Sequence, residues 1–177
     1  MLKVSLDIYG DDLHEECGVF GVFGVEDAPN LVYYGLHALQ HRGQEASGIS
    51  AFDGDKLNTV KGEGLVTEVF NPQKLSKLSG RIAIGHVRYS TTGGGGANNV
   101  QPFSFNHYTG DFALAHNGNL VNSKELARYL EVRGSLFHSS SDSELLAHLI
   151  KKDKSEDKRI DNIIEALNML EGAFAFL

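Results

Sequence analysis

The sequence predicts a domain of the α+β class, with strands and helices in mixed order, and three observations support this. Short apolar runs bounded by glycine or aspartate indicate strands, whereas apolar residues spaced three or four apart indicate helices. The chain has 177 residues, of which 41% are hydrophobic and 22% charged, enough for a substantial core. No internal repeat is present, and residues 93–96 are the only low-complexity stretch. We therefore expect one domain.

Two strands and a helix are expected in the first third of the chain. Residues 18–25 and 48–52 are short apolar or alternating runs bounded by glycine and aspartate, as strands are. Between them Pro29 suits a first helical turn, and apolar residues then follow at helical spacing until Gly43. These residues are Leu31, Val32, Leu36 and Leu39. Further strands are expected at residues 81–89 and 112–115.

The second half is predicted to be mainly helical. Asn122 and Glu125 resemble a capping box for a helix that ends at Gly134, and Ser141 or Asp142 would cap the next one. A last helix is indicated by apolar residues at a clean helical period and is ended by Gly172. Its apolar residues are Ile160, Ile163, Ile164, Leu167 and Leu170. The strand-like run 173–177 then stops without a turn, so we expect a fragment of a longer protein.

Charge and cysteine content exclude several classes of function. The formal net charge is -7 without a basic cluster, which argues against nucleic acid or an anionic membrane as a partner. No stretch approaches transmembrane length. Residues 1–16 contain no continuous hydrophobic core of an export signal, and with a single cysteine this favours the cytoplasm.

Cys17 is the chain's one cysteine, so an internal disulfide and a thiolate metal cage are excluded. The residue is either a small buried hydrophobe or a chemical group, and its position alone does not decide between them. If residues 1–16 are removed, Cys17 becomes the mature N-terminus.

Four polar segments stand where a simple core pattern would not place them: residues 41–45, 85–92, 116–119 and 139–144. Each lies near a predicted element that could hold a side chain in a cleft. Singly they have plainer interpretations, since Asn117-Gly118 is typical of a hairpin turn, Arg88 of a solvated edge strand and Asp142 of a helix N-cap. The eight histidines show no metal-binding spacing, so we expect no metal site.

Together with Cys17, these segments closely resemble the class II glutamine amidotransferases, which are N-terminal-nucleophile hydrolases. The matching motifs, in order, are Cys17-Gly-Val-Phe-Gly, Leu39-Gln-His-Arg-Gly-Gln-Glu, Gly85-His-Val-Arg-Tyr-Ser-Thr, His116-Asn-Gly-Asn-Leu and Ser141-Asp-Ser-Glu144. The second and third motifs are similar to the corresponding sequence motifs of the glutamine phosphoribosylpyrophosphate amidotransferase family. The resemblance runs from about Glu15 to Leu177.

The resemblance implies a four-layer αββα sandwich, truncated at its C-terminal end, with residues 1–16 as a propeptide and residues 17–177 as an incomplete glutaminase domain. It implies hydrolysis of the glutamine amide, with the ammonia passed to phosphoribosylpyrophosphate in the first committed step of purine biosynthesis. The acceptor domain would lie outside this chain. Two alternatives remain open: another class II amidotransferase, or an inactive fragment that serves as a binding module.

The resemblance also assigns roles to individual residues. Cys17 is the nucleophile, and its own α-amine is the base once the residues before it are removed. Asn117 and Gly118 form the oxyanion hole. Arg88 holds the α-carboxylate of glutamine through its planar fork, and Asp142 pairs with the α-ammonium.

Further roles follow from the same resemblance. Arg42 and Gly43 brace the backbone of the nucleophile, and residues 91–99, with four consecutive glycines, form a lid. A phosphate-binding loop is discounted there because no Gly-Lys-Ser/Thr follows. We expect L-glutamine as the substrate and no cofactor in this chain. A full-length parent would bind magnesium and, in some members, an iron–sulfur cluster, and would form a homo-oligomer.

Overall fold

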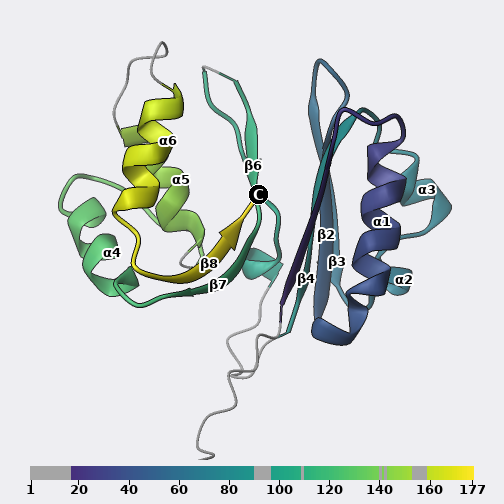
Figure 1. Ribbon diagram of the computed structural model, residues 1–177, viewed down its shortest axis with the longest axis horizontal. Helices are drawn as coiled ribbons and strands as arrows, with labels where there is room; N and C mark the ends of the chain where they lie inside the picture. The colour runs from purple at the N-terminus through teal and green to yellow at the C-terminus, as the bar shows by residue number, and fades with distance from the viewer. Residues whose placement is uncertain (1–16, 90–96, 109, 140, 142, 153–158) are drawn as a thin grey trace, which may run out of the picture.

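The computed structural model describes residues 17–89, 97–108, 110–139, 141, 143–152 and 159–177, which form two packed groups of strands and helices (Figure 1). The first group contains a four-stranded antiparallel sheet with the strand order β1-β4-β2-β3. Its strands are β1 (Gly18–Phe23), β2 (Ala46–Phe52), β3 (Leu57–Glu63) and β4 (Ile82–Arg88). The predicted α+β class is confirmed.

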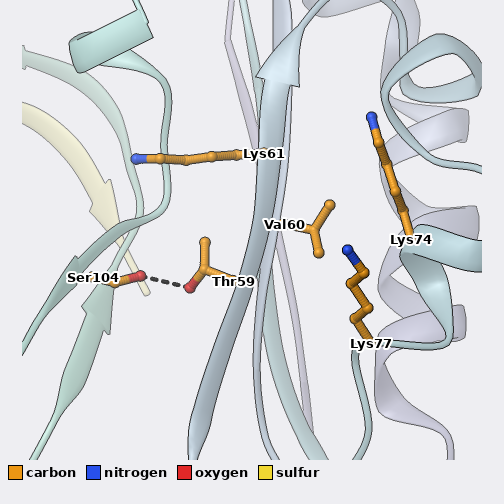
Figure 2. A pocket seen from close by; sticks show the side chains of 6 residues that line it. All are labelled: Thr59, Val60, Lys61, Lys74, Lys77 and Ser104. Carbon is orange, nitrogen blue, oxygen red and sulfur yellow. Dashed lines mark hydrogen bonds between the residues drawn. The ribbon is translucent and has the colours of Figure 1, made fainter.

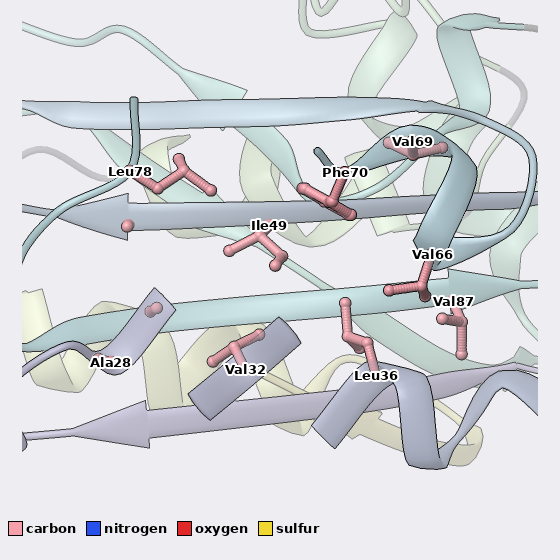
Figure 3. Close-up of a cluster of buried hydrophobic side chains, with 11 residues drawn as sticks. Ala28, Val32, Leu36, Ile49, Val66, Val69, Phe70, Leu78 and Val87 are labelled. Carbon is pink, nitrogen blue, oxygen red and sulfur yellow. The ribbon is translucent and has the colours of Figure 1, made fainter. Parts of the chain in front are cut away.

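Helices cover the outer face of this sheet (Figure 1). They are α1 (Ala28–Ala38), the 3₁₀ turn η1 (Gln40–Arg42), α2 (Val66–Val69) and α3 (Pro72–Leu75). The helix face of the sheet is apolar, and α1 buries Val32 and Leu36 against Ile49 of β2 (Figure 3). A Cβ at Gly85 of β4 would lie 2.6 Å from Val32, so a glycine is needed where α1 crosses the sheet.

Side chains alternate along each strand, so the opposite face of the sheet looks toward the second group. That group contains the hairpin of β5 (Phe103–Phe105) and β6 (Phe112–Leu114) and the antiparallel pair of β7 (His116–Leu120) and β8 (Gly172–Phe176). Three helices, α4 (Ser123–Glu131), α5 (Ser143–Lys152) and α6 (Arg159–Asn168), pack in a second apolar cluster with Leu114 and Leu120. The short 3₁₀ turn η2 (Ala97–Asn99) precedes β5.

Most predicted elements are confirmed within a few residues, but three local interpretations of single motifs are wrong. Asn117-Gly118 is not a hairpin turn, because both residues lie inside β7. Arg88 is not on an edge strand, because β4 lies between β1 and β2. The Asn122 side chain makes no capping bond to α4; it bonds instead to Met169 O and Glu171 N at 2.9 and 3.1 Å. Among the described residues, no helix is long and apolar enough to cross a membrane.

Candidate active site

Cys17 lies at the start of β1, next to the end of β4. The register of these antiparallel strands pairs Gly18 with Val87, and this places Cys17 beside Arg88 and Tyr89. The half-buried Cys17 thiol lies 3.7 Å from the carbonyl oxygen of Tyr89. The adjoining strand ends thus bring together Cys17 and Arg88, which are 71 positions apart in the sequence.

Arg42 fixes the backbone of Cys17. Its Nε donates to the carbonyl oxygen of Cys17 at 3.0 Å, from the 3₁₀ turn that follows α1. The bond joins a charged donor to a carbonyl and is therefore stronger than a neutral one. Arg42 thus lies where the resemblance placed it, next to the candidate nucleophile.

Gly43 is buried against the backbone of β4. A Cβ at this position would lie 2.7 Å from the carbonyl carbon of Val87 and 2.8 Å from the nitrogen of Arg88. Its backbone is extended, so the requirement for glycine comes from space and not from an unusual φ. The missing side chain lets the segment after η1 approach the strand end that carries Arg88.

Sequence reasoning assigned no role to Gln40, which stabilises this segment. Its Nε2 donates to the carbonyl oxygen of Gly43, and its Oε1 accepts from the backbone nitrogen of Val66, the latter at 2.6 Å. Gln40 lies within the motif that begins at Leu39, and this position is the sequence feature from which a role could have been predicted.

Asn117 and Gly118 lie on β7, opposite Ala175 and Phe174 of β8. Gly118 has a φ of +137°, and a Cβ there would lie 2.2 Å from the carbonyl oxygen of Ala173. Glycine is therefore required both by conformation and by space. β7 contacts β1, so the two candidate oxyanion donors lie on the strand that faces the one beginning after Cys17.

Three parts of the predicted site lie outside the described residues: Asp142, residues 1–16 and the first part of the expected lid, residues 91–96. The last part of that segment forms η2.

A buried polar cluster between the two groups was not predicted as a unit. It consists of His86, Gln101, His116 and Ser143, each less than 10% exposed. Burial lowers the pKa of His86 to about 3, so its imidazole is neutral at physiological pH. Among the described residues, neither ring nitrogen of His86 has a hydrogen-bond partner.

Glu144 stabilises the loop before α5. Its carboxylate accepts from the backbone nitrogens of His138 and Ser139 and, at 2.7 Å, from the Ser139 hydroxyl. Burial raises the pKa of Glu144, but these hydrogen bonds outweigh burial and hold the pKa below its ordinary value. The carboxylate is therefore an ionised anchor for this loop.

The described ranges contain no group of three or more histidine, cysteine, aspartate or glutamate side chains placed to hold a metal ion. The candidate residues offer a thiol, a guanidinium and amide donors.

Known proteins resemble this chain over most of its length. Residues 86–177 match a family described as the glutamine amidotransferase domain. Amidophosphoribosyltransferase from Bacillus subtilis is 58% identical over 166 residues, which are 93% of this chain and 35% of that protein. The chloroplastic amidophosphoribosyltransferase 3 of Arabidopsis thaliana is 50% identical over 94% of this chain and 31% of its own length.

Solved structures give the same result. The glutamine phosphoribosylpyrophosphate amidotransferase of B. subtilis, complexed with ADP and GMP, superposes with a TM-score of 0.84 at 56% identity. A structure described as the allosteric regulatory enzyme of purine biosynthesis superposes with a TM-score of 0.86 at 57% identity. Each match covers 90% of this chain and 34% of the solved chain. The chain thus spans about a third of the length of the relatives it matches.

Proposed function

This chain belongs to the glutamine amidotransferase domain family, and we propose that it hydrolyses the side-chain amide of L-glutamine to glutamate and ammonia. The observation that carries the proposal is the position of Cys17, whose carbonyl is held by Arg42 and whose thiol lies beside the end of β4 at Arg88. A nucleophile and a group that can bind a carboxylate are both needed to act on a free amino acid.

In the proposed reaction, the α-amine of Cys17 takes the thiol proton. An α-amine has a pKa of about 7.7–8.0 and a thiol about 8.5, so the two are nearly matched at neutral pH. The thiolate attacks the side-chain carbonyl carbon of glutamine, and the carbon–nitrogen bond breaks as the amine proton passes to the departing ammonia. Water then hydrolyses the thioester and releases glutamate.

Because the α-amine must be free, we propose that residues 1–16 are a propeptide and that the mature chain begins at Cys17. A nitrogen within a peptide bond is not basic, so the unprocessed chain would lack its base. Intact-mass analysis of the active protein should show loss of residues 1–16. Full activity in protein that retains them would contradict the assignment of the base.

The remaining roles are assigned on position and chemistry. We propose that Asn117 and Gly118 stabilise the oxyanion, where the loss of one donor typically costs about 2.7–4 kcal/mol of transition-state stabilisation. Arg88 would bind the α-carboxylate of glutamine and Asp142 its α-ammonium. Arg42 and Gly43 would hold the backbone on either side of the nucleophile.

For the parent protein we propose the activity that its relatives' names state, transfer of the ammonia to phosphoribosylpyrophosphate, on a domain outside this chain. Residues 17–177 would be an incomplete part of a four-layer αββα sandwich, which is supported by the helices on the outer sides of the facing sheets (Figure 1). Magnesium and an iron–sulfur cluster would belong to the rest of the parent. With Cys17 as its one cysteine, this chain does not fit a cluster, and no step above involves one.

A covalent label tests the proposed function. A diazoketone analogue of glutamine should alkylate Cys17, as identified by peptide mass spectrometry. Excess L-glutamine should suppress the labelling and D-glutamine should not, because the analogue must be oriented before the thiol can attack. Labelling of processed, folded protein that ignores L-glutamine would mean that Cys17 is only an accessible thiol.

A further inference from the structure

The side chain of Gln101 connects two segments of the second group. Its Oε1 accepts from the backbone nitrogen of His116 at 2.7 Å, and its Nε2 donates to the hydroxyl of Ser143 at 3.2 Å. The His116 ring also lies 3.0 Å from the same hydroxyl, through Nδ1. All three residues are buried, with exposed fractions of 7%, 3% and 0%. Both ends of one amide are therefore used where water cannot replace them.

The backbone around Gln101 is attached to the other group, the four-stranded sheet. Lys61 of β3 donates through Nζ to the carbonyl oxygens of Val100 and Pro102, at 2.5 and 3.2 Å. A Cβ at Gly48 of β2 would lie 2.2 Å from the carbonyl oxygen of Gln101, so the loop rests directly on the sheet. A shift of this loop would therefore break its contacts with β2 and β3.

Figure 2 shows the side chains on the two sides of β3. Lys61 and Thr59 extend to the side where Ser104 lies, and a hydrogen bond of 2.5 Å joins Thr59 to Ser104. Val60, Lys74 of α3 and Lys77, which follows α3, lie on the other side of the strand. Polar contacts from β3 therefore hold both the loop at Gln101 and the start of β5.

The partners of Gln101 are next to candidate site residues in the sequence. His116 directly precedes Asn117-Gly118, and Ser143 directly follows position 142. A shift of the His116 peptide would move the candidate oxyanion donors, and a shift of Ser143 would move the start of α5.

We infer that Gln101 is a positioning residue, which sets the distance of the oxyanion donors and of the α5 end from the sheet that carries Cys17. The inference rests on the proposed glutaminase function. Gln101 need not touch the substrate, because it acts through the His116 peptide and the Ser143 hydroxyl. A displacement of about 1 Å at such a distance from the chemistry can lower a rate about 100-fold.

The test compares two variants of the natural protein with a control. Gln101→Met keeps the length of the side chain and removes both hydrogen bonds, so kcat should fall about 10- to 100-fold and the KM for glutamine should rise. Ser143→Ala removes the hydroxyl that Gln101 Nε2 and His116 Nδ1 both contact. It keeps the bond from the His116 nitrogen to Gln101 Oε1, so KM should rise while kcat changes less than threefold. Gln73→Met, a change on the exposed surface of α3, should leave both constants unchanged.

All rates are divided by the fraction of sites that the diazoketone titrates, which corrects for unfolded protein. A merely structural role of Gln101 would lower that fraction and leave the corrected kcat and KM unchanged. If Gln101→Met does not fold, Gln101→Glu replaces it, because a carboxylate accepts from both His116 N and the Ser143 hydroxyl and should retain most of the activity.

The two hypotheses fail in different ways. Wild-type protein that releases no glutamate from glutamine overturns the proposed function and this inference together. Active wild-type protein with wild-type kcat and KM in folded Gln101→Met overturns the inference alone. A Ser143→Ala variant with the full kcat loss of Gln101→Met would also contradict the inference. The bond from the His116 nitrogen to Gln101, which Ser143→Ala keeps, would then have no effect of its own on kcat.

Discussion

Acid should destabilise this protein through one buried imidazole. His86 lies on the inner face of the central strand β4, and burial lowers its pKa from 6.5 to about 3. The charge of Arg88, two residues along the same face, lowers the pKa of His86 further. In the unfolded chain the same imidazole returns to its ordinary pKa near 6.5.

The magnitude follows from the difference between the two pKa values. Because the folded pKa of His86 is depressed, the unfolded state binds the proton first, and stability falls as the pH drops through the window from about 6.5 to 3. At about 1.36 kcal/mol per unit, the largest possible loss is about 5 kcal/mol, below pH 3. Between about pH 7.5 and pH 5 the expected loss is about 2 kcal/mol.

Urea unfolding at a series of pH values measures this effect as a change in the free energy of unfolding. Wild-type protein should lose about 2 kcal/mol between pH 7.5 and pH 5 from His86. His86→Leu and His86→Asn cannot titrate, so both should lose this part of the pH dependence, whatever their absolute stability. The reasoning is refuted if both variants keep the wild-type slope over this window.

Three further changes test the site. Gly43→Ala should destabilise the fold by about 1–3 kcal/mol in thermal unfolding and abolish activity. Gly62→Ala is the control: no atom lies closer than 3.5 Å to the new Cβ, so neither stability nor activity should fall. Arg42→Ala should lower the kcat for glutamine hydrolysis about 10- to 100-fold with little change in KM, because Arg42 holds Cys17 and not the substrate. Glu144→Gln should cost about 1–3 kcal/mol in urea unfolding at neutral pH, and this cost should disappear as the pH falls below about 4.5, through the lowered pKa of the carboxyl.

Local periodicity was enough to predict most of the elements that bury an apolar face. It located α1, because Val32 and Leu36 repeat at helical spacing, and it located β1, β2 and β4. It missed β3 (Leu57–Glu63), whose inner face carries Thr59 and Lys61 in place of apolar residues. Those side chains are satisfied by Ser104 and by loop carbonyls far away in the sequence, which no local pattern reveals.

The candidate site, too, could be predicted only in part from local sequence. The motifs proposed Cys17, Arg42 and Gly43 as site residues, and the structure brings these three to one end of the sheet. Gln101 could not be predicted, because its partners His116 and Ser143 are 15 and 42 positions away. Asn122 was predicted to cap a helix because its local sequence favours a cap. Its side chain instead bonds to backbone groups of Met169 and Glu171, which are distant in the sequence.

The polar interior between the two groups has a physical reason. An apolar interface of similar shape would be more stable, since desolvation is costly both for the His86 imidazole and for the Lys61 ammonium, and it lowers the pKa of each. Apolar contacts are not directional, however, whereas the amide of Gln101 can accept one hydrogen bond and donate the other only in one geometry. Under the proposed function, the candidate oxyanion donors must lie at a fixed distance from Cys17, which is on the other packed group. The hydrogen bonds of Lys61 and Thr59 across the interface supply this distance. Stability is therefore reduced at the position where the site requires a defined geometry.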